Sequence, residues 1–132
     1  MLSEPVTDRI YLKLLIVDDN PSIRTILGEM LHPYGSEIIF AENGMEAVRA
    51  LENNPDIDLI LMDVYMHNMD GFEATRRIRQ INKKVIIFVV TAAPLSELVE
   101  NFSGTTINDY FPKPFNKEYL NRLMLKHFKK HI

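Results

Sequence analysis

Short apolar runs alternate along the chain with segments whose apolar residues recur at helical spacing. The runs are nearly continuous, as in strands that are buried on both faces of a sheet. Five segments fit this description: residues 13–17, 37–41, 58–62, 85–90 and 109–111. Pro or Gly marks most junctions between these runs and the segments that follow. The pattern therefore predicts five β-strands, each followed by a helix.

The segment that begins at Asn20 shows the clearest helix signals. Asn20 is suited to cap a helix and Pro21 to occupy its first position. The apolar residues of this helix are Ile23, Ile26, Leu27, Met30 and Leu31. His32, Pro33 and Gly35 are expected to end it. Four further helices are predicted over residues 44–51, 72–81, 95–102 and 116–128, the last of them opened by Asn116.

Alternating strand and helix units predict a parallel sheet with right-handed crossovers and helices on both faces. The chain has 132 residues, 46% of them hydrophobic, which suffices for one domain with a real core. We therefore predict a single α/β domain of the (βα)5 doubly wound type, with a five-stranded parallel sheet, over residues 13–132. Residues 1–12 are expected to form an N-terminal extension outside this fold.

The charge and the cysteine content narrow the classes of function. A net charge of -3 gives no basic face for nucleic acid, so we expect no direct contact with nucleic acid. Cys is absent, which is compatible with the cytoplasm. No apolar run reaches the roughly 18 residues of a spanning helix. Glu4, Pro5 and Asp8 stand where a signal peptide needs an apolar core. We therefore expect a cytoplasmic domain without membrane contact.

Acidic residues follow two of the predicted strands. Asp18 and Asp19 come directly after the first strand, and Asp63 comes directly after the third. In open parallel sheets the working crevice lies beyond the carboxyl ends of the strands, so these carboxylates are expected to converge there. Three carboxylates in one crevice require a cation, so the pattern predicts a metal site.

The ends of the fourth and fifth strands add other polar groups to this crevice. Thr91 and Ala92 follow the fourth strand, and Lys113 follows the fifth, between Pro112 and Pro114. Phosphoryl transfer requires in-line positioning and neutralisation of the charge on the phosphoryl oxygens. Carboxylates with bound magnesium, a hydroxyl group and a lysine meet both needs. The residues therefore favour phosphoryl chemistry.

In this combination, the chain resembles the receiver domain of two-component response regulators, the CheY-like family with a flavodoxin-like fold. The resemblance covers all but about the first dozen residues. It rests on the following residues and motifs in order: Asp18-Asp19, Asp63, the segment Met66-His67-Asn68-Met69-Asp70-Gly71, Thr91, Tyr110 and Lys113-Pro114-Phe115. Each is common by itself, but together, and at the ends of the right strands, they form a specific pattern.

The resemblance implies a role for the acidic residues. Asp63 would be the nucleophile that takes a phosphoryl group from a phosphohistidine on a sensor histidine kinase or a histidine phosphotransfer protein. Asp18, Asp19 and Asp63, with the backbone carbonyl of Tyr65, would bind Mg²⁺, for which Mn²⁺ is expected to substitute. The chain would then be a phosphoacceptor that takes part in its own phosphorylation and dephosphorylation, and not an enzyme.

The resemblance also implies a switch. Lys113 would pair with Asp63 at rest and with a phosphoryl oxygen afterwards, and Thr91 would hydrogen-bond the phosphoryl group. As Thr91 moves inward, Tyr110 would change its side-chain position. The surface of the fourth helix, fifth strand and fifth helix would then change and control an output domain or partner protein. The bond before Pro114 would be cis, as in the family.

Two residues depart from what is usual in the family. His67 stands where proline is usual, and a neutral substitution is expected there. Tyr65 stands two residues after the nucleophile, where the side chain influences how water reaches the phosphoryl group, so we predict slow self-dephosphorylation. Asp70 and Gly71 are expected to shape the turn into the third helix.

Other readings remain open from the sequence. His127 and His131 are spaced i, i+4, but two ligands do not make a zinc site, so we expect solvated side chains. A flavodoxin-like cofactor module would need a phosphate-cradling loop where this chain has Asp18-Asp19-Asn20. A haloacid dehalogenase-type phosphatase would carry an Asp-x-Asp nucleophile motif there. A receiver-like interaction module without phosphorylation is a further alternative. The 132 residues contain no recognisable output domain.

Overall fold

A five-stranded parallel sheet forms the centre of the molecule. The structure, a computed structural model, describes residues 11–128. The strand order is β2-β1-β3-β4-β5, and every neighbouring pair is parallel. The strands are β1 (Leu12–Val17), β2 (Gly35–Ala41), β3 (Leu59–Asp63), β4 (Ile86–Thr91) and β5 (Asp109–Pro112).

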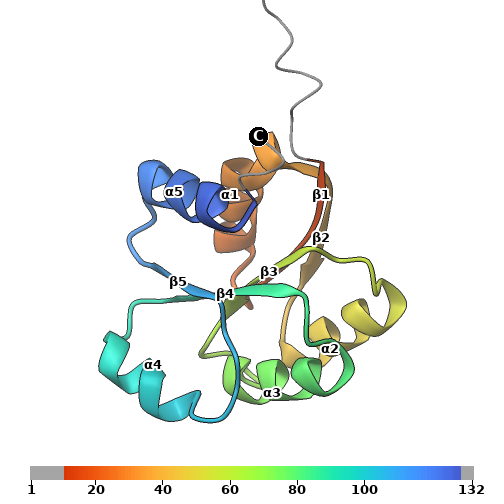
Figure 1. The fold of residues 1–132 in the computed structure, drawn as a ribbon, viewed down its shortest axis with the longest axis vertical. Helices are drawn as coiled ribbons and strands as arrows, with labels where there is room; N and C mark the ends of the chain where they lie inside the picture. Colours follow the sequence, from red (N-terminus) through yellow and green to blue (C-terminus); the bar gives the residue numbers. More distant parts are fainter. Residues whose placement is uncertain (1–10, 129–132) are drawn as a thin grey trace, which may run out of the picture.

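Helices cover both faces of this sheet. They are α1 (Pro21–Leu31), the short 3-10 helix η2 (His32–Tyr34), α2 (Gly44–Asn53), α3 (Gly71–Ile81), α4 (Leu95–Asn101) and α5 (Lys117–Phe128). In Figure 1, α1 and α5 lie above the sheet, and α2, α3 and α4 lie below it. The arrangement confirms the predicted (βα)5 doubly wound fold. Among the described residues, no helix has the length and apolar character needed to cross a membrane.

Residues of the central strands alternate between two apolar cores. In β1, Leu14 and Ile16 belong to the core beneath α1 and α5, whereas Leu15 and Val17 belong to the core that α2 and α3 cover. All four side chains are at most 1% exposed. This double burial explains why the strand sequences are nearly continuous apolar runs.

Polar side chains cap the helices where the sequence predicts it. Asn20 accepts hydrogen bonds from the backbone N–H groups of Ser22 (2.8 Å) and Ile23 (3.3 Å) at the start of α1. Asn116 accepts one from Tyr119 N (2.8 Å) at the start of α5. His32 is the C-cap of α1, as expected. The two asparagine caps satisfy backbone N–H groups that the helices themselves leave unpaired.

The strand boundaries differ from the predicted ones by one or two residues. β3 and β4 each run one residue further, so Asp63 and Thr91 are the last residues of strands and not loop residues. Asp63 pairs with Val90 in the ladder, because a polar side chain does not interrupt backbone pairing. β1 begins at Leu12, one residue before the predicted start, and residues 1–10 of the proposed extension lie outside the described residues.

Candidate functional site

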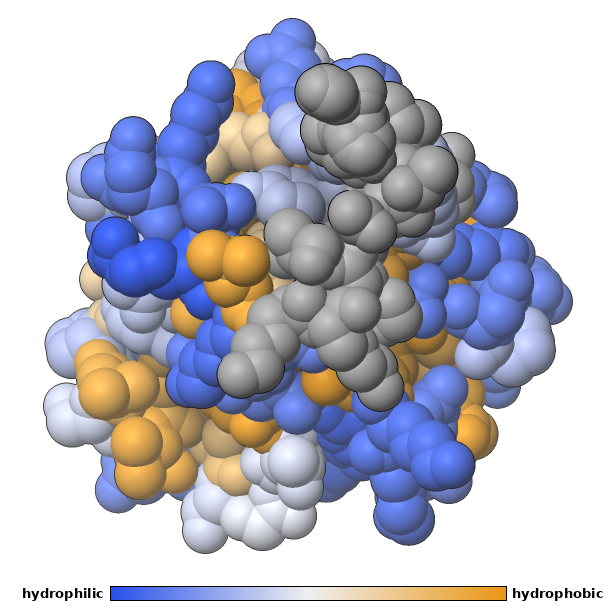
Figure 2. Space-filling model, turned by 45° about the horizontal axis from the view of Figure 1, so that its top comes forward, coloured by the Kyte–Doolittle hydropathy of each residue, from blue (hydrophilic) through white to orange (hydrophobic). Residues whose placement is uncertain are grey.

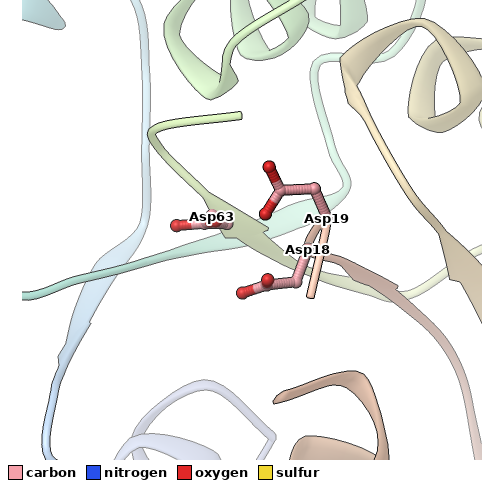
Figure 3. A group of neighbouring side chains, drawn as sticks. All are labelled: Asp18, Asp19 and Asp63. Carbon is pink, nitrogen blue, oxygen red and sulfur yellow. The ribbon is translucent and has the colours of Figure 1, made fainter. Parts of the chain in front are cut away.

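Three aspartates meet at the carboxyl ends of β1 and β3. Asp18 and Asp19 follow β1, Asp63 ends β3, and one oxygen from each carboxylate lies within 4.8 Å of the other two. Figure 3 shows the three side chains gathered beyond the two strand ends. This is where the strand order changes direction, since β2 lies on one side of β1 and β3 on the other. The predicted convergence of Asp18, Asp19 and Asp63 is present.

The Asp18 side chain is held firmly, but one of its oxygens has no hydrogen-bond partner. Its backbone N–H donates to Ala41 O (3.1 Å), and its Oδ1 accepts from Asn20 N (2.9 Å). Arg24 Nη1 donates to the backbone oxygen of Asp18 (2.7 Å). Asp18 is 2% exposed, and its Oδ2 is buried without a partner. A buried, unpartnered carboxylate oxygen is costly unless a cation binds it.

Burial and mutual repulsion make these carboxylates hard to ionise in the absence of a metal. Asp63 is 7% exposed, and burial, together with the charge of Asp18, raises its pKa to about 7, against the opposing charge of Lys113. Burial also raises the pKa of Asp18 above its ordinary value. A divalent cation would remove this repulsion. The donor set consists of oxygens alone, which suits Mg²⁺, so the residues fit the predicted metal.

A close approach between β3 and α3 shapes the floor of the site. Gly71 N donates to Val64 O (2.7 Å), and a Cβ on Gly71 would lie 2.2 Å from the backbone oxygen of Asp63. Only glycine fits at this position. Asp70 caps α3 by accepting from Glu73 N (2.9 Å). Asp70 and Gly71 thus shape the turn into α3, as predicted, and hold the end of β3 in place.

The other predicted residues line the same open pocket, which has a volume of about 590 Å³. Its lining includes the three aspartates and Tyr65, Thr91, Ala92 and Lys113. Thr91 is 3% exposed, and its Oγ1 accepts from Ala93 N (3.1 Å). Lys113 N donates to Thr91 O (3.1 Å), and the Lys113–Pro114 peptide bond is cis, as the resemblance implies.

Lys113 does not form the resting ion pair with Asp63 that the resemblance implies. Among the described residues, no ion pair within 4.0 Å includes Lys113. Its charge acts on Asp18 and Asp63 at longer range. It partly offsets the rise in the pKa of each that burial causes. A flexible lysine at this distance remains available to a further anion in the pocket.

Tyr110 lies outside the pocket but contacts the backbone that forms its edge. The Tyr110 hydroxyl donates to Ala93 O (2.9 Å), and the Tyr119 hydroxyl donates to Tyr110 O (3.1 Å). Ala93 therefore contacts both Thr91, through its N–H, and Tyr110, through its carbonyl. This shared residue is a direct physical connection between the two predicted switch positions.

The histidines behave differently from one another. His67 is exposed and lies 4.0 Å from Asp19. The prediction of a solvated side chain is wrong for His127. Its ring packs against Phe88 (5.2 Å between centroids), and its Nε2 lies 2.9 Å from Asp109 Oδ2. His131 lies outside the described residues. Among the described residues, the one group that could hold a metal is the aspartate cluster.

Two contacts at the site escape a reading of the sequence. Arg24 anchors the Asp18 backbone, and Glu97, in the first turn of α4, accepts a hydrogen bond from the Tyr65 hydroxyl. An arginine one turn into a helix and an acidic residue in a first turn are common features with many causes. No signal in the sequence distinguishes them, because both contacts depend on how distant segments pack.

Comparisons with known proteins agree with this geometry. Residues 14–124 match the profile of the response regulator receiver domain family. The chain is 34% identical over 122 residues to the peroxide stress-activated histidine kinase mak3 of Schizosaccharomyces pombe. The match covers 87% of this chain but only 5% of that kinase, so the chain spans a small part of this relative.

Solved structures are similar in fold and in sequence. One is the receiver domain of sensor histidine kinase PA1611 from Pseudomonas aeruginosa, solved with a magnesium ion in its active-site cleft. It has a TM-score of 0.78 and 34% identity, and the match covers 88% of this chain and 96% of that domain. The receiver domain of Ssk1 from Saccharomyces cerevisiae, solved with the histidine phosphotransfer protein Ypd1, has a TM-score of 0.79 and 28% identity, and the match covers 89% of each chain. This chain belongs to the response regulator receiver domain family.

Proposed function

We propose that this chain receives a phosphoryl group on Asp63 from a phosphohistidine of a sensor histidine kinase or a histidine phosphotransfer protein. An ionised oxygen of Asp63 attacks the phosphorus atom, the bond between phosphorus and the histidine nitrogen breaks, and the histidine ring leaves with the electron pair. The product is an aspartyl phosphate on the chain itself. The chain is thus a phosphoacceptor and not an enzyme.

The unpartnered Oδ2 of Asp18, beside two further carboxylates, is the observation that carries this proposal. Asp18, Asp19 and Asp63, with the backbone carbonyl of Tyr65, would hold Mg²⁺, and Mn²⁺ would substitute for it. Bound Mg²⁺ neutralises charge on the phosphoryl oxygens and favours the ionised form of Asp63. The magnesium ion in the PA1611 receiver domain supports this assignment.

Lys113 and Thr91 would bind the phosphoryl oxygens that point away from the aspartates. Lys113 lines the pocket and forms no ion pair within 4.0 Å in the part of the chain that the structure describes. The Thr91 hydroxyl has a proton to donate, and its oxygen accepts from Ala93 N. When Thr91 turns toward the phosphoryl group, the hydrogen bond from Ala93 N is lost. Ala93 then shifts, and the hydrogen bond from Tyr110 to Ala93 O shifts with it.

The output surface in this proposal is formed by α4, β5 and α5. Leu95 and Val99 of α4 are more than half exposed. Figure 2 shows hydrophobic side chains at the lower left, on the side where α4 lies in Figure 1. A downstream output domain or partner protein would bind here and sense the state of Thr91 and Tyr110. The receiver would begin at Leu12, where β1 begins, and the residues before it would be an extension. The reaction would take place in the cytoplasm.

The experiment that tests this function is intact mass after incubation with acetyl phosphate, with and without Mg²⁺. The native chain is expected to gain one phosphoryl group only when Mg²⁺ is present. Asp63→Asn should gain none, whereas Asp109→Asn, which changes an aspartate in β5 outside the pocket lining, should behave as the native chain does. No gain in the native chain, and no response to a beryllium fluoride titration, would instead support a receiver-like interaction module.

A further inference from the structure

Tyr65 connects the pocket to α4. It lies two residues after Asp63 and lines the pocket, and its hydroxyl donates to Glu97 Oε2 in the first turn of α4. The side chain is 54% exposed, so packing alone leaves it free to turn toward solvent. Among the described residues, this is the one side-chain hydrogen bond between the loop after β3 and α4.

An aromatic contact holds the other side of the same ring. The Tyr65 ring meets Phe72 of α3 edge to face, with 6.0 Å between centroids and planes at 80°. Phe72 in turn packs against Phe102, the C-cap of α4, at 4.6 Å. The hydroxyl contact with Glu97 and the ring contact with Phe72 together determine where the Tyr65 ring lies over the pocket.

The position of this ring matters for hydrolysis of the aspartyl phosphate. A water molecule must approach the phosphorus atom in line with the bond to Asp63, on the open side of the pocket, and displace the carboxylate. Tyr65 lines this pocket, and an aromatic ring held at the pocket edge would restrict the approach of water. A ring without its hydroxyl contact samples other rotamers and leaves the path open for part of the time.

We propose that Glu97 is a positioning residue for this site, and that its hydrogen bond with Tyr65 keeps the ring in place and lengthens the life of the phosphoryl group on Asp63. This inference rests on the proposed function and deepens it. Because Glu97 belongs to α4, a displacement of the first turn of α4 breaks the contact. The lifetime of the phosphorylated form therefore depends on the position of the helix that presents the output surface.

The test compares rates of phosphoryl loss by intact mass after removal of acetyl phosphate, with Mg²⁺ present. Glu97→Ala and Tyr65→Phe each remove one partner of the hydrogen bond, and the double variant removes both. Glu97→Gln keeps an acceptor for the Tyr65 hydroxyl. Glu100→Ala is the matched control, because Glu100 is an exposed acidic residue of the same helix without a side-chain hydrogen bond among the described residues.

Glu97→Ala and Tyr65→Phe should each accelerate phosphoryl loss about three- to ten-fold, a range that corresponds to one exposed hydrogen bond. The double variant should be no faster than the single ones, Glu97→Gln should lie within about two-fold of the native rate, and Glu100→Ala should match it. Amide hydrogen exchange of residues 64–67 should rise in the same variants and not in Glu100→Ala.

Four results would overturn the proposal. A native rate in Glu97→Ala, or a double variant whose effect is the product of the single effects, would show that the contact does not set the lifetime. Equal acceleration in Glu100→Ala would show that loss of charge on α4 is the cause. A native chain that takes up no phosphoryl group would refute the proposed function itself, and this inference with it, so the two failures are distinguishable.

Discussion

Asp63 and Asp109 lie in different strands of the sheet and have opposite electrostatic surroundings. Asp63 ends β3 among other carboxylates, whereas Asp109 begins β5, and its Oδ2 accepts from Lys126 Nζ and His127 Nε2, each at 2.9 Å. Burial raises the pKa of Asp63 to about 7. Burial also acts to raise the pKa of Asp109, but the bonds from His127 and Lys126 outweigh it and hold that pKa below its ordinary value.

Arg79, like Asp109 and unlike Asp63, is a charged residue whose polar atoms have protein partners. It lies near the amino ends of β4 and β5. Its side chain is buried, yet its nitrogens donate to Thr106 O (2.8 Å), Val85 O (2.7 Å) and Asn108 Oδ1 (2.9 Å). These bonds tie α3 to the segments that enter β4 and β5. One end of the sheet is therefore cross-linked by satisfied charges, and the other keeps unsatisfied charges for a ligand.

The largest expected effect on the free energy of unfolding comes from removing the hydrogen bonds of Arg79. Arg79→Met removes the buried hydrogen bonds and leaves the carbonyl groups of Thr106 and Val85 without this donor. We expect the free energy of unfolding to fall by about 3–4 kcal/mol, measured by urea denaturation. Arg79→Lys keeps the charge but not the planar fork, and should recover less than half of the loss. A loss below about 1 kcal/mol for Arg79→Met would show that these bonds do not stabilise the fold.

Replacing Asp63 is expected to raise the free energy of unfolding, whereas replacing Arg79 lowers it. In the absence of divalent cations at pH 8, Asp63→Asn removes a carboxylate whose ionisation the fold disfavours. The variant should gain about 1–3 kcal/mol in the free energy of unfolding, because a pKa shift is a difference in stability between protonation states. Urea denaturation of both chains measures the gain. A loss of stability would show that the three carboxylates are not in conflict.

The pH dependence of this gain has a defined direction. The pKa of Asp63 rises from its ordinary 3.8 to about 7 in the folded chain, so the folded state holds the proton more tightly than the unfolded state. The native chain should therefore lose stability relative to Asp63→Asn as the pH rises from about 4 to 7, with no further change above. Denaturation of both chains in metal-free buffers across this range tests the direction. A constant difference would contradict the raised pKa.

Mg²⁺ should reduce the difference in the free energy of unfolding between Asp63→Asn and the native chain, because it binds the ionised carboxylates. At ten times its dissociation constant, Mg²⁺ should stabilise the native chain by about 1.4 kcal/mol at pH 8, and Asp63→Asn by less. Thermal unfolding with and without Mg²⁺ measures both shifts, with Na₂SO₄ at equal ionic strength as the control. Equal shifts in the two chains would place the cation elsewhere.

The contrast also marks what the sequence reveals and what it does not. Local patterns predict the alternation of strands and helices along the chain, and the structure agrees. They also predict the convergence of Asp18, Asp19 and Asp63 and the helix cap at Asn20. His127 was mispredicted because its partner Asp109 is 18 residues away and belongs to a strand. Contacts between distant segments depend on packing, which no local pattern encodes.

Replacing Asp109 is expected to have the smallest effect on the free energy of unfolding. Asp109→Asn should lower the free energy of unfolding by about 0.5–1 kcal/mol at pH 7, a modest value because solvent screens the exposed Lys126. A lowered folded pKa contributes stability that is present above the ordinary value of 3.8 and is lost as the pH falls through the folded pKa. The native chain should therefore lose its advantage over Asp109→Asn only below about pH 4.

His127 and Lys126 make separable contributions to that effect. His127→Leu removes the half-buried donor, whereas Lys126→Met removes the exposed one, and both keep an apolar side chain on α5. Because burial strengthens a hydrogen bond to a carboxylate, we expect the His127 variant to lose more stability than the Lys126 variant in urea denaturation at pH 7. The reverse order would mean that charge, and not the buried contact with His127, keeps Asp109 ionised. Asp109 would then be kept ionised by the charge of Lys126, much as bound Mg²⁺ would keep Asp63 ionised among its neighbouring carboxylates.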